Sequence, residues 1–136
     1  MIRTFVDASI LIAAARGQAP PAHKAMEILD DPGREFVSSD FVKLEVLPMA
    51  VYHGRADEVA FYQVFFASVA QWPSVSDTLS AAALEEACRT GMHALDALHV
   101  AAAVAAYAAE LVTAESSAKP IHRTRSLRVL TIHPPA

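Results

Sequence analysis

Short segments rich in β-branched and aromatic residues alternate along the chain with longer segments of helical composition. Strands that alternate with helices form a parallel sheet, because the helix carries the chain back before the next strand begins. We expect about four to five short strands, with helices covering both faces of the sheet. This alternation predicts an α/β fold. The expected strands are 2–7, 35–39, 73–77, 110–115 and 127–132.

Several residues mark the ends of the expected helices. Gly17 and Gly91 follow helical segments and are expected to end them, because glycine readily adopts the left-handed conformation at a helix C-terminus. Asp40 is expected to cap the helix that follows it, and either Ser76 or Asp77 is expected to cap a later one.

The composition fits one folded domain that spans residues 1–136. Of these 136 residues 54% are hydrophobic, enough for a sizeable core. Cys88 is the single cysteine, so no internal disulfide can form, as is usual in a reducing cytosol. Asp7 interrupts the apolar segment where an export signal would be continuous, and the apolar run after His99 is shorter than the roughly 20 residues that cross a membrane. We therefore expect a cytoplasmic protein.

Four carboxylates fall where the carboxyl ends of parallel strands are expected to meet. Asp7 directly follows the first expected strand, and Glu115 ends the fourth. Glu45 lies early in the helix after the second strand, and Asp96 lies near the start of the apolar helix before the fourth. Ligands of open parallel sheets bind at this edge. The four side chains are therefore candidates for one site.

Each of these acids also has a structural explanation. Asp7 could cap the first helix, and Asp96 could be favoured by the dipole of its own helix. Glu45 could lie on a solvated helix face, and Glu115 in an ordinary loop. His99, one turn beyond Asp96, could face the same region, but a packed, hydrogen-bonded histidine is the preferred interpretation.

An ionised aspartate in so apolar a helix is costly unless a partner or a metal ion balances its charge. Carboxylates that cluster raise one another's pKa unless a cation lies among them. Hard oxygen ligands favour Mg²⁺ or Mn²⁺ over softer metals. The residues therefore point to a divalent cation at this edge of the sheet.

The order of these motifs resembles the PIN-domain ribonucleases, and most closely the VapC-type toxins of bacterial toxin–antitoxin pairs. The resemblance rests on FVDASILI, VKLEVLP, LDALHVAAAV and LVTAE, and it runs from residue 2 to about residue 131. It implies a three-layer α/β/α fold with a central parallel sheet. By position, Asp7, Glu45 and Asp96 match the first three acids of the family's metal site, and Ser9 matches a hydroxyl residue that supports it.

The fourth acid departs from the family's more frequent Thr-x-Asp, because Thr113 is followed by Ala114 and Glu115. Glu115 is one methylene longer, so it reaches the metal directly or through water. Under the resemblance Thr113 supports the site and Glu115 is the fourth catalytic acid. The implied chemistry is hydrolysis of RNA phosphodiester bonds with Mg²⁺ or Mn²⁺.

Charge is unevenly distributed along the chain. The net charge of −4 by itself discourages nucleic-acid binding, and all 15 acids lie at or before Glu115. Lys119, Arg123 and Arg125 follow without any acid. Under the resemblance these three hold RNA phosphates beside the metal. The alternative is a segment that only improves solubility.

The resemblance also implies two protein partners, a small antitoxin and a second copy of the chain in a homodimer. Phe61, Tyr62, Phe65 and Phe66 lie close together in the sequence. They offer more aromatic surface than one helix face buries, which favours an interface. Plain core packing is the alternative.

Three other functions remain open. A receiver-type signalling domain also places acids at strand ends, but it has paired acids after the first strand, where Asp7 stands alone. A binding module could keep the PIN fold without catalysis, and Glu115 is the feature that favours it. A PIN nuclease that processes RNA without acting as a toxin would share the same residues.

Overall fold

The computed structural model describes residues 1–17 and 20–135, and it consists of a parallel sheet flanked by helices. The α/β prediction is confirmed. None of the described helices is long and apolar enough to cross a membrane. The elements are β1 (Ile2–Val6), α1 (Ala8–Arg16), α2 (Pro21–Leu29), β2 (Arg34–Val37), α3 (Asp40–Tyr52), α4 (Ala56–Ala67), α5 (Asp77–Thr90), α6 (Ala94–Ala105), β3 (Glu110–Thr113), a 3₁₀ turn (Pro120–Arg123) and β4 (Arg128–Thr131).

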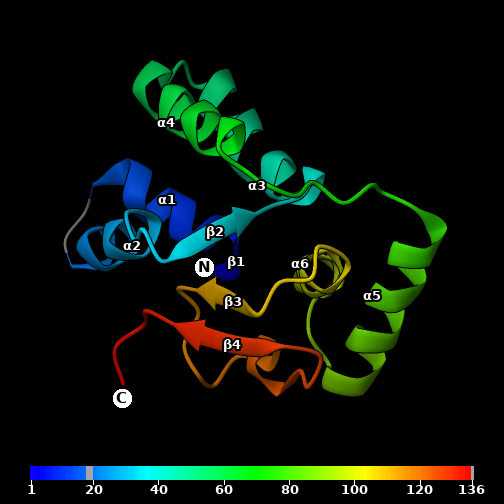
Figure 1. Cartoon of the computed structure of the whole chain (residues 1–136). Helices are drawn as coiled ribbons and strands as arrows, with labels where there is room; N and C mark the ends of the chain where they lie inside the picture. The colour runs from blue at the N-terminus through cyan, green and yellow to red at the C-terminus, as the bar shows by residue number, and fades with distance from the viewer. Residues whose placement is uncertain (18–19, 136) are drawn as a thin grey trace.

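The four strands are parallel and lie in the order β2-β1-β3-β4. Strand β1 is central, because Phe5 pairs with Val37 of β2 on one side and with Leu111 of β3 on the other. In Figure 1 α1 and α2 lie on one side of the sheet, and α5 and α6 lie on the other. The pair α3 and α4 extends beyond the β2 edge (Figure 1). The expected three-layer arrangement is therefore confirmed.

The core is built from the two central strands and from α6. Phe5 and Leu111 are fully buried, and α6 buries the consecutive residues Ala101–Ala103. Small side chains let this helix approach both the sheet and α5, between which it lies in Figure 1. The position explains why α6 is so apolar: both of its sides face protein.

The expected helix ends at the two glycines are confirmed. Gly17 and Gly91 adopt the left-handed conformation, with φ of 64° and 73°, at the C-termini of α1 and α5. At the other end of α5, Ser76 is the cap, and its hydroxyl accepts a hydrogen bond from the backbone N–H of Leu79 at 3.2 Å. Of the two residues proposed for this cap, Ser76 is the correct one.

Asp40 does not cap α3. The N-cap is Ser39, and Asp40 lies in the first turn of the helix. Its carboxylate accepts a hydrogen bond from the indole N–H of Trp72 at 2.8 Å. The predicted cap is therefore wrong, because the carboxylate is engaged by a distant side chain and not by the backbone of its own helix.

The strand predicted at 73–77 is also wrong. The chain does pass beside β2, but earlier: Gln71 forms an isolated parallel bridge with Val37, and the N–H of Ser38 donates to the Gln71 carbonyl at 3.4 Å. Pro73 then has no N–H to donate to a ladder, and the chain leaves the sheet. The exposed residues that follow lead into α5.

The aromatic side chains of α4 pack inward. Tyr62 is fully buried, Phe65 and Phe66 are each 8% exposed, and Phe61 packs against the same core. The Tyr62 hydroxyl donates a hydrogen bond to the Glu58 carboxylate at 2.6 Å. Core packing therefore accounts for this cluster, and it gives no argument for an interface.

Candidate active site

Asp7 lies at the carboxyl end of β1, at the junction with α1. Its N–H donates to the Val112 carbonyl at 3.1 Å, which extends the β1–β3 ladder beyond Val6. Its side chain caps α1, because Oδ1 accepts a hydrogen bond from the N–H of Ser9 at 3.0 Å. The capping explanation is therefore correct. The cap also holds this carboxylate, which is 4% exposed, at the edge where ligands of such sheets bind.

Ser9 connects Asp7 to the turn after β3. Its hydroxyl donates to Asp7 Oδ1 at 2.5 Å and accepts a hydrogen bond from the N–H of Ala114 at 2.8 Å. The Thr113 hydroxyl lies 3.4 Å from that of Ser9 and accepts a hydrogen bond from the N–H of Glu115 at 3.1 Å. The two hydroxyls thus hold Asp7 and the backbone of Glu115 in a defined relative position.

Asp96 lies in the first turn of α6, as expected, and is partly buried. The contacts of Glu115 run through its backbone: its N–H bonds to Thr113, and its carbonyl accepts a hydrogen bond from the Thr131 hydroxyl at 2.6 Å. In the described part of the chain, the carboxylates of Asp96 and Glu115 have no hydrogen-bonding partner. Both acids are therefore available to a ligand.

The acids influence one another electrostatically. Burial raises the pKa of Asp7, and the charge of Asp96 adds to this effect. Burial also raises the pKa of Asp96, and Glu115 and Glu45 add to it. His99 acts in the opposite direction on both groups. Asp96 is therefore the acid that links the four, because it repels each of the other three.

Glu45 approaches these acids from α3. Its carboxylate contacts Nε2 of His99, while its side chain stays 31% exposed. His99 is 1% exposed, and its ring centroid lies 5.8 Å from that of Phe5. Its Nδ1 has no hydrogen-bond partner among the described residues. His99 is thus a packed, hydrogen-bonded histidine, as preferred, and its partner is one of the predicted acids.

The donor set fits a hard divalent cation. Its free ligands are carboxylate oxygens, and a cation would relieve the repulsion that raises the pKa of Asp7 and Asp96. Within residues 1–17 and 20–135, no three His, Cys, Asp or Glu side chains stand close enough together to hold one ion. Glu45, which contacts His99, would have to turn toward the other acids.

The sequence matches the family model of the PIN domain over residues 4–121, a span that includes all four acids. The chain belongs to the PIN domain family. This family consists of nucleases, which generally use divalent metal ions. This assignment excludes the alternative of a receiver-type signalling domain. No curated protein matches the sequence significantly.

Solved structures share this PIN fold at low sequence identity. VapBC2 from Rickettsia felis, bound to a DNA fragment from their promoter, superposes with a TM-score of 0.71 at 17% identity, covering 96% of this chain and 98% of that one. VapBC-1 from nontypeable Haemophilus influenzae gives 0.63 at 14% identity, covering 96% and 98%. PAE2754 from Pyrobaculum aerophilum gives 0.59 at 19% identity, covering 94% and 90%.

The three basic residues expected to hold RNA differ in their surroundings in this PIN domain. All three are exposed, but among the described residues only the side chain of Arg123 has a hydrogen bond to another element. Arg123 donates from Nη1 to the carbonyl of Thr90 at 2.9 Å, at the C-terminus of α5. A guanidinium there satisfies one of the carbonyls that a helix end leaves unpaired. Arg123 therefore attaches the basic segment to α5.

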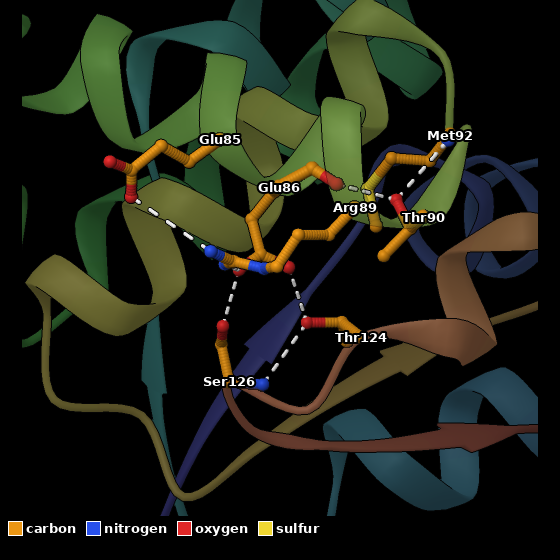
Figure 2. Close-up of polar contacts among 7 residues, drawn as sticks. All are labelled: Glu85, Glu86, Arg89, Thr90, Met92, Thr124 and Ser126. Carbon is orange, nitrogen blue, oxygen red and sulfur yellow. Dashed lines mark hydrogen bonds and ion pairs between the residues drawn. The ribbon is translucent and has the colours of Figure 1, made fainter.

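A buried carboxylate strengthens this attachment, as Figure 2 shows. Glu86 on α5 is 4% exposed and accepts hydrogen bonds from the hydroxyls of Thr124, at 2.5 Å, and Ser126. Arg89 donates to the same carboxylate. Burial acts to raise the pKa of Glu86, but these three donors outweigh it and lower the pKa. Sequence reasoning missed Glu86, because nothing near it in the sequence indicates partners about 40 residues later.

Proposed function

We propose that this PIN domain is a metal-dependent ribonuclease that hydrolyses RNA phosphodiester bonds and acts as the toxin of a toxin–antitoxin pair. The observation that carries the proposal is the buried carboxylate of Asp7 at the edge of the sheet and its repulsion by Asp96, which Glu45 and Glu115 also repel. This repulsion would be relieved by a bound cation, and the PIN family consists of nucleases.

In this proposal Asp7, Glu45 and Asp96 bind Mg²⁺ or Mn²⁺, and Glu115 binds it directly or through water. Such a cation, when bound, lowers the pKa of a water and stabilises negative charge on the phosphate. The chain's own contribution is position. Ser9 and Thr113 hold the carboxylate of Asp7 and the backbone of Glu115, so these groups need little reorganisation during the reaction.

The RNA backbone is proposed to lie over the basic segment. Lys119 and Arg125 are exposed, and Lys119 follows closely after Glu115 in the chain; both would contact phosphates. Arg123 would act mainly by holding the segment against α5, through its bond to Thr90. Contacts of this kind orient the substrate without reading its sequence.

We further propose one domain over residues 1–136, a cytoplasmic location, a small antitoxin as partner and a homodimer. The toxin role is supported by the VapC-type motifs and by the fold shared with the two VapBC structures. A PIN nuclease that processes RNA would share all of these residues. Rescue of growth by a neighbouring antitoxin gene would separate the two roles, because a processing enzyme needs no such partner.

The test is cleavage of a mixed RNA pool by the purified chain with Mg²⁺, with Mn²⁺ or with EDTA. We expect cleavage only with metal, and a loss of at least about 100-fold in Asp7→Asn and Asp96→Asn. Glu115→Gln tests the fourth acid in the same assay. Asp57→Asn is the matched control, since Asp57 is an exposed acid on α4.

Two outcomes would contradict the proposal. Cleavage that persists in EDTA, or equally in both site variants, would mean that these carboxylates do not perform the reaction. If the wild type cuts no RNA and calorimetry detects no Mn²⁺ binding, the chain is a non-catalytic PIN-fold binding module.

A further inference from the structure

A small pocket adjoins the candidate active site at the carboxyl edge of the sheet. It lies between the start of α2, the turn after β3 and the residues that follow β4, and its volume is about 100 Å³. Pockets that hold drug-sized ligands are larger, roughly 300–1,000 Å³, so this one suits a single planar ring. Its apolar walls are Pro20, Pro21, Ala114, Ile132 and Pro134.

Hydrogen bonds connect these walls to the acids. The N–H of Ala114 donates to the Ser9 hydroxyl at 2.8 Å, and the same hydroxyl donates to the Asp7 carboxylate. On the β4 side, the N–H of Ile132 donates to the carbonyl of Thr113 at 2.9 Å. Ser9 therefore links one wall of the pocket to Asp7, so the pocket and the acids share the carboxyl edge of the sheet.

Two polar side chains stand at the rim, Lys24 from α2 and His133 after β4. Both residues are exposed. The His133 Nδ1 lies 2.8 Å from the carbonyl of Pro134, which can only accept a hydrogen bond, so Nδ1 carries the proton. Nε2 of the neutral ring is then an acceptor, while Lys24 is a donor. The rim thus offers both kinds of partner to the edge of a polar ring.

We infer that this pocket binds one nucleobase of the RNA substrate, next to the bond that is cut. Nucleobases are planar, stack on apolar and aromatic side chains, and carry donors and acceptors along their edges. The pocket offers apolar walls together with a hydrogen-bond donor and an acceptor at its rim, and Ser9 links it to Asp7. The inference rests on the proposed ribonuclease function, and it adds a determinant of base preference that the acids and the basic segment lack.

Binding is measured first, on the ¹⁵N-labelled full chain in EDTA, so that no cleavage is involved. The probes are the four nucleoside 5′-monophosphates and inorganic phosphate. At least one nucleotide is expected to shift the amide signals of Ala114, Ile132 and Lys24, while phosphate leaves them unchanged. Equal shifts with phosphate would mean that Lys24 binds an anion and not a base. No shift with any nucleotide at millimolar concentration would also overturn the inference.

Variants then test the rim. Lys24→Ala and His133→Ala are expected to weaken nucleotide binding about three- to tenfold. His23→Ala is the matched control on α2, because His23 is exposed and pairs with Glu27 instead. If His23→Ala weakened nucleotide binding as much as Lys24→Ala does, Lys24 would have no specific role in binding the base.

Sequencing of the cleaved RNA ends gives the second readout. The base preferred at one position beside the cut is expected to become less selective in Lys24→Ala and His133→Ala. An unchanged preference in both variants would overturn the inference while leaving the ribonuclease intact. Nucleotide binding without any RNA cleavage would instead count against the proposed function alone.

Discussion

The carboxylate of Glu45 on α3 contacts Nε2 of His99 on α6, and this contact joins the first and the last helix of the connection between β2 and β3. The histidine is almost completely buried, whereas the glutamate is partly exposed. His99 therefore determines where Glu45 lies when no cation is bound. It also acts on Asp7 and Asp96, where it opposes the burial that raises the pKa of both.

His99→Ala is expected to destabilise the chain and to reduce cleavage together. The substitution leaves a cavity beside Phe5 and removes the partner of Glu45, at a cost of about 2–4 kcal/mol in the free energy of unfolding. Urea denaturation measures the first effect and RNA cleavage the second. His23→Ala removes an exposed histidine and should change stability by less than about 0.5 kcal/mol. Wild-type stability in His99→Ala would mean that His99 is not packed as described.

Asp7→Asn is expected to abolish cleavage and yet increase stability at pH 7 in EDTA. Because folding raises the pKa of Asp7, its ionised form is less favourable in the folded than in the unfolded chain at neutral pH. Asparagine keeps an acceptor for the N–H of Ser9 and removes this cost, a gain on the order of 1 kcal/mol. The gain should shrink as the pH falls toward 3.8, since the Asp7 carboxylate of the wild type then gains a proton and loses its charge. Urea denaturation midpoints of the wild type and Asp7→Asn across this pH range test the prediction. A variant that is less stable than the wild type at pH 7 would contradict it.

Divalent metal should stabilise the wild type against heat. A ligand at about 100 times its dissociation constant adds about 2.7 kcal/mol to the folded state, so the melting temperature rises by several degrees. In Asp96→Asn the rise should be much smaller, because a ligand and part of the repulsion are gone. Differential scanning fluorimetry with MgCl₂, MnCl₂ and NaCl at equal ionic strength makes the comparison. A similar rise of the melting temperature in the wild type and in Asp96→Asn would mean that the metal binds at another site.

How much of this site the sequence could predict depends on how local each contact is. Asp7, Glu45 and Glu115 could be found because each follows a strand, and the ends of parallel strands meet at one edge. The contact between Glu45 and His99 could not, since it depends on how α3 packs against α6. The prediction of a strand at 73–77 was wrong because strand formation depends on a neighbouring strand with which to pair. The chain pairs with β2 only at Gln71 and then leaves the sheet.

Glu86→Gln is expected to lower the free energy of unfolding at pH 7 by about 1–3 kcal/mol, because an amide cannot accept from Thr124, Ser126 and Arg89 as a carboxylate does. Folding lowers the pKa of Glu86, so its contribution is present above its ordinary value of 4.5 and is lost as the pH falls through the lowered value. The difference between the two proteins should therefore disappear in acid.

The control is Glu85→Gln, because Glu85 neighbours Glu86 but its side chain is 74% exposed. Its effect on stability should stay below about 0.5 kcal/mol. If the deficit of Glu86→Gln were the same at pH 7 and at pH 3, the carboxylate charge would not be its cause.

Lys119→Ala and Arg125→Ala are expected to weaken RNA binding, whereas Arg123→Ala should mainly reduce stability. A lost phosphate contact on a single strand lowers the slope of log affinity against log salt by about 0.7. Loss of the bond from Arg123 to Thr90 costs about 0.5–1.5 kcal/mol of stability. Fluorescence anisotropy of a labelled RNA in EDTA at several salt concentrations, together with urea denaturation, separates the two effects.

Arg55→Ala is the control, because Arg55 lies in the connection between α3 and α4. An equal loss of salt slope in Arg55→Ala and Lys119→Ala would show that RNA responds to total charge and not to this segment.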